Sequence, residues 1–476
     1  PLAVVQPSGP SARASALDTF PLSLCLLCSR RSDASRRGLP CLASPPLSLP
    51  RCCCGDEDKN TDGDGTPLRR GEAMLASAVL RLALLSMVTG FLTVHRSIVG
   101  GHGWRHLARR SAVRFVDIGE HQSVDAAAEV LRRGGLVAFP TETVYGLGAC
   151  IHSESALASV FEAKGRPRTD PLIVHVAAHE DAEQVVDLSP AARRAFQCLA
   201  RDAWPGPLTL VAKAKSSVSE LVTAGSGAVG VRMPSHRVAQ ALIRAVGSPV
   251  AAPSANRFGH VSPTRAEHVV RDLANQPVPV TVLGDDTNTG CDVGIESTVL
   301  RIEEPHPGSI VARVLRAGAV TESRIRTCFE AAGLSVDVVG AQVAVPRVSP
   351  ADEVQASPGQ LLKHYAPEVD TFIASERRLS FKSSRPFIVL DFHGHLASLK
   401  ASATAYQDLS PAGNPAEASA GLFSALRWAE DSAVNAARPD ESPCILVPDL
   451  VDAAEGDELL AAVWDRLFRS ASGRRL

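Results

Sequence analysis

Residues 134–148 read GGLVAFPTETVYGLG, and this stretch sets the expected architecture. GGLVAF is apolar and β-prone, so it predicts a buried strand over 135–139. Pro140 then removes a backbone donor, and hydroxyls around one carboxylate precede two glycines that permit close backbone approach. One interpretation is a strand, a turn and a second strand with polar side chains in water. The other is a lined pocket, where Thr141 and Thr143 share one side and offer hydroxyls to a small polar ligand.

On both sides of this stretch, from about Val116 to residue 330, helical and strand periods follow one another. Interleaved strands and helices of this kind are typical of one α/β domain. The expected helices cover 123–133, 155–164, 190–201, 236–246 and 264–274, and the expected strands cover 135–139, 172–176, 208–213, 229–233, 279–283 and 297–302.

A Pro-rich segment follows, and then the α/β pattern restarts. Residues 340–367 contain four prolines and no periodicity, which predicts a linker that drapes over a neighbouring surface. Beyond it, 387–392 and 444–450 are strand-like, whereas 418–431 and 457–471 are amphipathic helices. We therefore expect a first domain over 117–335, a linker over 336–369, and a smaller open-sheet α/β domain over 370–476.

The N-terminal part has a different composition. Residues 1–73 are rich in Ser, Pro, Arg and Cys without periodicity, which predicts a disordered low-complexity extension. Residues 74–116 contain no acidic residue, and their apolar stretch 76–94 is borderline for the about 20 residues that a transmembrane helix needs. An acid-free, Arg-bearing leader indicates organelle targeting rather than stable membrane insertion. The compartment is then the cytoplasm, or a mitochondrion or plastid reached through this leader.

Overall composition excludes some classes of protein. A formal net charge of −2 gives no strong nucleic-acid signature, so any anion site must be local. Six of the 11 cysteines lie before residue 55 and the others are scattered, which suits a reducing compartment. Cys25 and Cys28 have metal-like spacing, but no second pair or histidine pair follows, so we expect no metal site there.

Polar stretches interrupt the first domain at strand–loop junctions, where α/β sites form. Lys164 and Arg166 end a helix, which is ordinarily a place for surface charges. His175 alone would most often be a core histidine. Arg232 stands in the middle of an apolar strand, where an unpaired charge is costly and an anion is needed. Taken together, the cations and hydroxyls fit a polyanionic small molecule such as a nucleotide, although no standard nucleotide loop is present.

The order of these motifs resembles the YrdC-type threonylcarbamoyl-AMP synthases over about 120–325. SPGQLLKHYAP (357–367) resembles the interdomain segment of the long, two-domain form, and the two last helices resemble its C-terminal domain. The resemblance implies a twisted mixed-sheet YrdC-like catalytic domain, a linker, and a second smaller open-sheet, Rossmann-like α/β domain. The matching motifs are FPTETVYGLG (139–148), KGRPRTDPLIVH (164–175), WPGPLTLV (204–211), VGVRMPSH (229–236), APSAN (252–256) with SPT (262–264), EST (296–298) and LRAG (315–318).

The activity that this resemblance implies is a nucleotidyl transfer. L-Threonine, bicarbonate and ATP, with magnesium accompanying ATP, give threonylcarbamoyl-AMP and pyrophosphate. A downstream tRNA threonylcarbamoyl transferase then modifies the adenosine beside the anticodon. The amine must form a carbamate that attacks the α-phosphate, so the reaction needs no protein nucleophile. It needs cations that hold two anions together, a task for Lys164, Arg166 and Arg232.

The resemblance also assigns residues to ligands. Lys164 and Arg166 would be catalytic through charge, and Tyr365 would fold over the nucleotide from the linker, which would act as a lid. Tyr145 would shape the floor beside the nucleotide. The residues at threonine positions are Thr143, His175, Arg232, Ala252 and Ser297. The residues at ATP positions are Arg166, Asp170, Ala228, Ser254, Ser262, Arg316 and Tyr365.

Three departures from the family pattern bear on single assignments. Asp170 stands where Asn is frequent, and a carboxylate near a triphosphate is tolerated through magnesium or water. Ala228 replaces a hydroxyl residue, so its contact with ATP would use the backbone. EEPHPGS (303–309) lengthens a hairpin before Arg316 and would shift that arginine.

Two other classes of function remain as alternatives. A non-catalytic module that binds tRNA or double-stranded RNA would expose its arginines, whereas an enzyme would bury Arg232 and His175 in one pocket. Weak RNA binding is also compatible with the enzyme. A carbamoyl-transfer enzyme of hydrogenase maturation would carry acylphosphatase and zinc-finger patterns upstream, and residues 1–116 contain neither.

Overall fold

The computed structural model describes residues 112–119, 122–284, 291–341, 355, 357–359, 361–375, 385–438 and 441–476. All of them belong to one compact unit, Leu84–Leu476. The expected extension, most of the expected leader and the Cys25–Cys28 pair lie outside the described residues. Within the ranges given above, no helix has both the length and the apolarity needed to cross a membrane.

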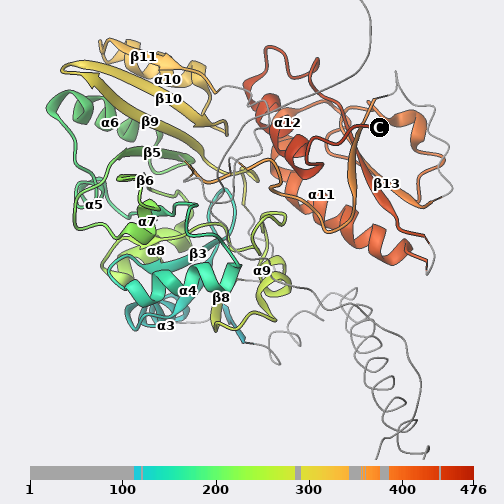
Figure 1. The fold of residues 1–476 in the computed structure, drawn as a ribbon, viewed down its shortest axis with the longest axis horizontal. Coiled ribbons are helices and arrows are strands. Elements are labelled where there is room, and N and C mark those ends of the chain that lie inside the picture. The colour runs from blue at the N-terminus through green and yellow to red at the C-terminus, as the bar shows by residue number, and fades with distance from the viewer. Residues whose placement is uncertain are drawn as a thin grey trace, which may run out of the picture. The chain divides into compact units, whose positions relative to one another are not determined.

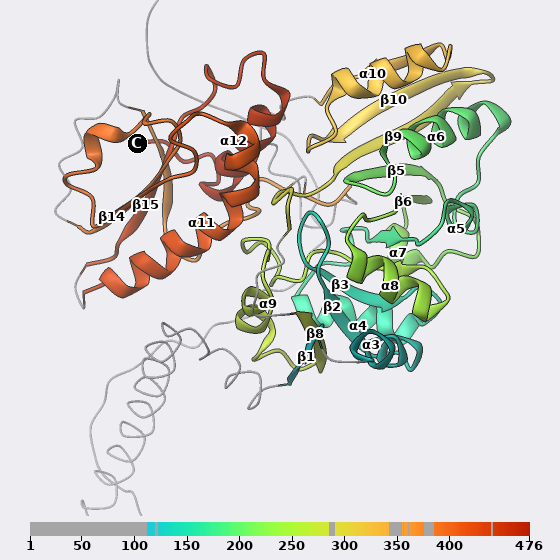
Figure 2. The ribbon, with the colours of Figure 1, turned by 180° about the vertical axis from the view of Figure 1, so that it is seen from behind.

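The first domain is built on one large mixed sheet (Figures 1 and 2). Its strand order is β1-β8-β2-β3-β7-β4-β6-β5-β9-β10-β11, with both parallel and antiparallel neighbours. The strands are β1 (Val113–Asp117), β2 (Leu136–Phe139), β3 (Gly146–Cys150), β4 (Ile173–His175), β5 (Leu208–Lys213), β6 (Ala228–Arg232), β7 (Val250–Ala251), β8 (Val280–Gly284), β9 (Thr298–His306), β10 (Ser309–Arg316) and β11 (Val336–Val339).

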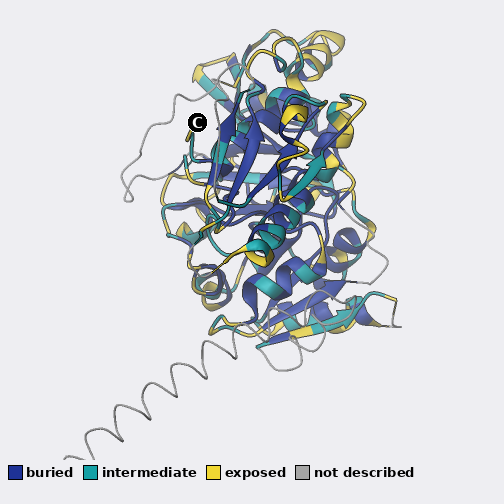
Figure 3. Cartoon of the chain, turned by 90° about the vertical axis from the view of Figure 1, so that its right-hand side faces the viewer, coloured by how far each residue is buried: buried dark blue, intermediate teal, exposed yellow. Residues whose placement is uncertain are grey.

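Helices cover this sheet on both faces, and for this reason β2 is apolar at every position. Leu136 and Ala138 join the larger core with α4, α6, α9 and α10, whereas Val137 and Phe139 pack with α3 and α8. Buried residues accordingly follow the strands and exposed residues follow the outer loops and helices (Figure 3). The helices are α3 (Ser123–Arg132), α4 (Glu154–Lys164), α5 (His179–Ala182), α6 (Pro190–Ala203), α7 (Glu220–Thr223), α8 (Arg237–Val246), α9 (Ala266–Leu273) and α10 (Glu322–Ala331).

The second domain has a parallel sheet of its own, in the order β12-β15-β13-β14. Its two long helices, α11 and α12, pack on one face of this sheet through apolar side chains. The other face is closed by shorter segments such as η3 (Ala397–Leu399). The elements are β12 (Thr371–Ala374), β13 (Phe387–Asp391), β14 (Ala405–Asp408), α11 (Pro415–Ala436), β15 (Cys444–Pro448) and α12 (Glu458–Ser470).

These two sheets confirm the expected fold class, and they differ from the expected boundaries at both ends of the first domain. β1 begins at Val113, inside the expected leader, because it adds to the sheet edge beside β8. β11 begins at Val336, inside the expected linker, because it pairs with β10. Edge strands are short and half-exposed, so their apolar pattern is weak. The hairpin of β9 and β10 accommodates the EEPHPGS insertion, turning at Gly308 with φ +81.

Candidate active site

The ends of neighbouring strands bring a histidine and an arginine together. β4 ends at His175 and β6 ends at Arg232, and the two residues are direct partners in the parallel ladder. Both side chains are buried. Burial, assisted by the charge of Arg232, lowers the pKa of His175 to about 3, so this imidazole is neutral near pH 7. A buried arginine beside a buried neutral histidine is expected of a ligand pocket and not of a surface that binds RNA.

Arg232 is not an isolated cation, contrary to the expectation from its strand. Its Nη2 lies 2.7 Å from Oε1 of Glu142, and its Nε donates to the carbonyl oxygen of Gly206 at 3.3 Å. The other Glu142 oxygen accepts the amide of Ser235 at 3.0 Å. Because both partners are buried, a substrate carboxylate that binds Arg232 must share it with Glu142. Sequence reasoning missed Glu142, although a buried arginine beside a TET motif was the signal.

Several hydroxyl groups lie near the ion pair of Arg232 and Glu142. Thr141 and Thr143 do share one side of the turn, with their Oγ1 atoms 2.9 Å apart. Ser297 precedes β9, and its Oγ lies 2.8 Å from Oγ1 of Thr209 on β5. Since β5 and β9 begin at the edge where β4 and β6 end, Ser297 lies at the same edge as His175 and Arg232.

Ala252 directly follows β7, which pairs with β4 on the side opposite β6. Its amide donates to the carbonyl oxygen of Ile173 at 2.8 Å. A Cβ on Gly146 would lie 3.3 Å from the Cβ of Ala252, so the glycine allows the TETVYG turn to pack on this position. Tyr145 itself is buried in the larger core, and its amide donates to the carbonyl oxygen of Pro263 at 2.8 Å.

Lys164 is a buried residue and not a surface charge at a helix end. It is the last residue of α4, which Gly165 terminates with φ +62. Its Nζ donates to the carbonyl oxygen of Ser254 at 2.6 Å and to that of Asn256. Burial lowers the pKa of Lys164 well below its ordinary value, and the neighbouring Arg166 adds to this effect. The lysine therefore fastens the APSAN loop and places its amino group close to Arg166.

Arg166 and Asp170 form a buried ion pair. The guanidinium Nη2 lies 2.9 Å from Oδ1 of Asp170 and also donates to the carbonyl oxygen of Pro171 at 2.8 Å. Burial raises the pKa of Asp170, and Arg166 opposes this rise. Asp170 therefore has a cationic partner within the chain, which accounts for a carboxylate beside an expected triphosphate.

Arg316 is the last residue of β10, and Ser262 lies in the loop before α9. Nε and Nη2 of Arg316 donate to the carbonyl oxygen of Ser297 at 3.1 and 3.0 Å, so the long hairpin leaves this arginine at the base of β9. Ser262 donates to Oε1 of Glu296 at 2.6 Å. Arg316 also donates to the carbonyl oxygen of Pro358 in the linker at 3.3 Å.

Ala228 lies at the first residue of β6, at the opposite strand end from Arg232. The two residues are four positions apart, or about 13 Å along an extended strand. The backbone amide of Ala228 donates to Oγ of Ser226 at 3.2 Å and makes none of the contacts described above. The structure therefore does not bring Ala228 to the His175–Arg232 pair.

The linker residues that the structure describes lie against the first domain. The amide of Ala366 donates to the carbonyl oxygen of Gly259 at 2.9 Å. Tyr365 is fully buried, with its ring 5.4 Å from that of Phe423 on α11. A Cβ at Gly359 would lie 2.7 Å from the Tyr365 hydroxyl, so only glycine allows the linker to pass here.

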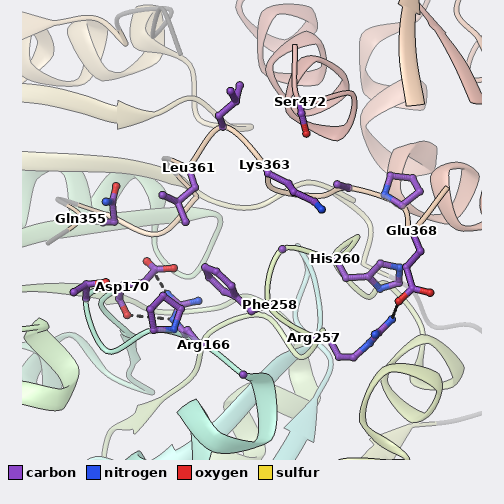
Figure 4. Close-up of a pocket in the computed structure, with 17 residues that line it drawn as sticks. Arg166, Asp170, Arg257, Phe258, His260, Gln355, Leu361, Lys363, Glu368 and Ser472 are labelled. Atoms are coloured by element: carbon purple, nitrogen blue, oxygen red, sulfur yellow. Dashed lines mark hydrogen bonds and ion pairs between the residues drawn. The ribbon is translucent and has the colours of Figure 1, made fainter. Parts of the chain in front are cut away.

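Between the linker and the first domain is a cavity of about 960 Å³ (Figure 4). Arg166 and Asp170 lie on one side and Leu361 and Lys363 on the opposite side. The ion pair of Arg257 and Glu368 closes one end at 2.5 Å. This volume accommodates a nucleotide-sized ligand. The remaining lining residues are Gly165, Pro167, Thr169, Phe258, Gly259, His260, Gln355, Leu362, Ala366, Pro367 and Ser472.

A charge network that sequence reasoning missed lies beside this cavity. His260 contacts Asp272 at 3.1 Å and Glu430 of α11 at 3.0 Å. Arg427, also from α11, contacts Asp272 at 2.9 Å. Burial alone would lower the pKa of His260, but hydrogen bonds to both carboxylates raise it to about 9. These residues are far apart in sequence and belong to no motif, so the sequence did not predict this network.

Comparisons with known proteins agree with this arrangement. Residues 129–318 match the Sua5/YciO/YrdC family, described as "Telomere recombination", and 320–472 match "Threonylcarbamoyl-AMP synthase, C-terminal domain". The threonylcarbamoyl-AMP synthase of Bacillus subtilis is 41% identical over 259 residues, covering 53% of this chain and 68% of that protein. That of Pyrococcus abyssi is 37% identical over 259 residues, covering 54% and 70%.

Among solved structures, the P. abyssi Sua5 protein complexed with L-threonine matches with a TM-score of 0.61 and 30% identity. The match covers 76% of this chain and 98% of that one. The first family match covers most of the first domain, and the second covers the residues from α10 through the linker and the second domain. The chain therefore belongs to the Sua5/YrdC family of threonylcarbamoyl-AMP synthases, in its two-domain form.

Proposed function

We propose that this chain is a nucleotidyltransferase that makes L-threonylcarbamoyl-AMP from L-threonine, bicarbonate and ATP, with release of pyrophosphate and water. The observation that carries the proposal is the convergence of buried cations on a cavity that the linker covers. Arg166 lines this cavity, and the buried Lys164 and Arg316 lie close enough behind it to interact electrostatically with Arg166. Arg232 lies at the end of β6. The reaction joins two anions, which repel each other unless cations hold them together.

Different residues would bind the threonine and the phosphates. Arg232 would bind the threonine carboxylate, and Thr143 and Ser297 would bind its hydroxyl group. The neutral imidazole of His175, whose Nδ1 donates to the carbonyl oxygen of Ile173 at 3.2 Å, would lie beside the amine. Once the amine has become a carbamate, its oxygen attacks the α-phosphate, and Lys164, Arg166 and Arg316 stabilise the phosphate charge as pyrophosphate departs.

Magnesium would enter with ATP. Among the residues that the structure describes, no group of three His, Cys, Asp or Glu side chains lies close enough to hold a metal ion. Asp170 is the carboxylate that lines the cavity beside Arg166, and Arg166 already neutralises it. The ion would therefore be held chiefly by phosphate oxygens and water, which is the usual manner of magnesium at phosphate sites.

The product is a labile mixed anhydride, so a second enzyme must consume it. We infer that a tRNA threonylcarbamoyl transferase does so, and that the reaction takes place in the cytoplasm or in a mitochondrion or plastid. A fluorescent fusion that includes residues 74–116 distinguishes these compartments. Any tRNA contact of the synthase itself would be weak, because the arginines of the site are buried.

The direct test incubates the full chain with ATP, labelled threonine and bicarbonate. We expect pyrophosphate release and a labelled adenylate detected by mass spectrometry, both dependent on bicarbonate. A second reaction with tRNA and a purified transferase should label the tRNA. Release of ADP and phosphate in place of pyrophosphate would contradict the proposal.

A further inference from the structure

Arg466 is a charged residue at the most buried part of the second domain. It lies on α12, and none of its side chain is exposed. One nitrogen donates to the carbonyl oxygen of Ala462 on its own helix at 3.2 Å, whereas Nη2 has no hydrogen-bond partner among the described residues. A buried guanidinium is costly, and an apolar residue would pack a helix equally well. Its presence therefore requires an explanation.

Two groups from outside the second domain contact Arg466. Its Nε lies 3.3 Å from Oε2 of Glu296 in the catalytic domain. Its guanidinium carbon lies 5.8 Å from the centre of the Tyr365 ring in the linker, which is within range of a cation–π contact. One side chain of the second domain thus contacts both other parts of the protein.

Glu296 connects Arg466 to the expected nucleotide site. Its second oxygen, Oε1, accepts the hydroxyl of Ser262 at 2.6 Å. A carboxylate fixed on one side by a guanidinium holds the hydroxyl on its other side in a single orientation. The chain of contacts therefore runs from Arg466 through Glu296 to Ser262.

Tyr365 also depends on the second domain for its conformation. Its backbone has φ +58, a left-handed value that is unfavourable for a tyrosine. The ring is held between Arg466, Phe423 and His364, whose ring centre is 4.1 Å away. The surrounding contacts must offset the backbone strain, and the two contacts from α11 and α12 belong to the second domain.

We propose that Arg466 is a positioning residue through which the second domain sets the nucleotide side of the active site. It fixes Ser262 through Glu296, and it holds the ring of Tyr365 directly. The inference rests on the proposed function, because that function assigns Ser262 and Tyr365 to ATP. It gives the second domain a role in the reaction that reaches beyond packing.

The test replaces Arg466 by methionine, which has similar length and no charge. We expect the KM for ATP to rise roughly tenfold, while the KM for threonine changes less than about threefold. Arg466→Lys keeps a charge beside Glu296 but loses the planar contact with Tyr365, so the KM for ATP should recover in part. A merely structural role would lower the melting temperature and the active fraction without separating the two KM values.

A second variant at the same domain contact provides the control. Arg271 of α9 pairs with Asp431 of α11 at 2.6 Å and contacts neither Glu296 nor Tyr365. Arg271→Met should leave the ratio of the two KM values unchanged. If it raises the KM for ATP as much as Arg466→Met does, Arg466 acts only by docking the domains and the proposal is wrong.

Double-mutant cycles test the contacts of Arg466 with Tyr365 and Glu296 even where the single variants are destabilised. Arg466→Lys is combined with Tyr365→Leu and, separately, with Glu296→Gln. Non-additive effects on the KM for ATP in both cycles support the proposal. Additive effects in both would overturn it. Failure of pyrophosphate release in the unmodified protein would instead contradict the proposed function, which keeps the two failures distinct.

An unrelated observation concerns two thiols remote from this site. Cys198 on α6 and Cys328 on α10 have their sulfur atoms 3.2 Å apart, and each sulfur lies within 3.7 Å of the carbonyl oxygen of the other residue. Both residues are partly exposed. A disulfide needs the sulfur atoms at about 2.05 Å, so closure requires about 1.2 Å of movement.

We infer that this pair is a modification site that forms an intramolecular disulfide by exchange with an oxidised low-molecular-weight disulfide. One thiolate attacks the reagent and releases one thiol. The second thiolate then attacks the mixed disulfide and releases the other, so two protein thiols and one disulfide give one protein disulfide and two thiols. Burial and the adjacent Cys198 raise the pKa of Cys328 to about 12, which makes the exchange slow near neutral pH.

Oxidised glutathione is the probe, applied to the full chain for hours at about pH 8.5. Peptide mapping without reduction should find the peptides of Cys198 and Cys328 joined, with loss of two hydrogens. In Cys328→Ser, Cys198 should instead carry glutathione. Two separately glutathionylated or unmodified residues in the unaltered chain would overturn the inference.

Discussion

Glu142 and Asp170 each neutralise an arginine that the motifs assign to a substrate. Arg232 lies 2.7 Å from Glu142, and Arg166 lies 2.9 Å from Asp170. A buried guanidinium without an anion would be unstable, so the chain supplies one before any ligand arrives. In the proposed function, a substrate anion would therefore share each arginine with a carboxylate of the chain.

Replacing Arg232 by Ala should raise the KM for threonine at least roughly tenfold, because losing a buried charge-assisted contact costs about 2–4 kcal/mol. The KM for ATP should change less. Pyrophosphate release measured against threonine concentration gives both values. The double variant Arg232→Ala with Glu142→Gln controls for the carboxylate left unpaired. Unaltered threonine dependence would show that Arg232 serves only its ion pair.

Selectivity for threonine over valine follows from the hydroxyls of Thr143 and Ser297, which valine would leave without its share of hydrogen bonds. We expect kcat/KM for threonine to exceed that for valine by roughly a hundredfold. Ser297→Ala should narrow this ratio. Because the same hydroxyl contacts Thr209 and accepts from Arg316, any structural effect of the change should lower both kcat/KM values alike. Competing turnover with both amino acids measures the ratio. Equal rates in the unaltered protein would disprove the assignment of the pocket.

Helices and strands of the core followed their sequence patterns closely. α3, α4 and β5 begin and end within about one residue of the expected ranges, because caps such as Ser153 and Gly165 fix the helix ends. β1 and β11 could not be predicted in the same way, since each depends on a partner strand distant in sequence.

In the candidate site, too, the sequence predicted some features, whereas others depend on contacts between distant residues. Motif spacing identified Lys164 and Arg166, but their burial depends on the linker and the APSAN loop. Glu142 and Glu296 were missed as partners because a carboxylate beside hydroxyls has no pattern of its own. Only the fold shows which cation each carboxylate meets.

The linker segment 357–367 contacts the first domain at several points, and its Tyr365 is buried against the second. Tyr365→Ala should weaken ATP binding and let water reach the labile product, because the segment covers the cavity. The measurement compares pyrophosphate released with threonylcarbamoyl-AMP recovered, and the ratio should rise above one. Tyr406→Ala, in the sheet of the second domain, serves as a control. A fully active Tyr365→Ala enzyme would argue for a passive spacer.

The two domains are joined by charge as well as by apolar contact. Asp272 of the first domain meets Arg427 of the second, and His260 lies between Asp272 and Glu430. Removing one member of such a buried pair lowers the stability of the fold far more than replacing the whole pair by apolar residues does. The remaining charge would be buried without a partner and without contact with water.

Protonation of His260 makes this junction dependent on pH. Its folded pKa of about 9 exceeds the ordinary value of 6.5, so its contribution is complete below about pH 6.5 and disappears as the pH rises through 9. The upper bound on this contribution is about 3 kcal/mol. The difference in melting temperature between the unaltered protein and His260→Gln should therefore shrink between pH 6.5 and 9. A constant difference over that range would mean that His260 is neutral.

The internal pairing of Arg232 with Glu142 and of Arg166 with Asp170 also bears on how the protein responds to salt. Exposed basic sites attract mobile counterions, and ligands that displace them bind less tightly as ionic strength rises. In this protein the anion already beside each arginine is a buried carboxylate of the chain itself and not a mobile counterion. Threonine affinity should thus be nearly insensitive to the ionic composition of the compartment, whether cytoplasm or organelle.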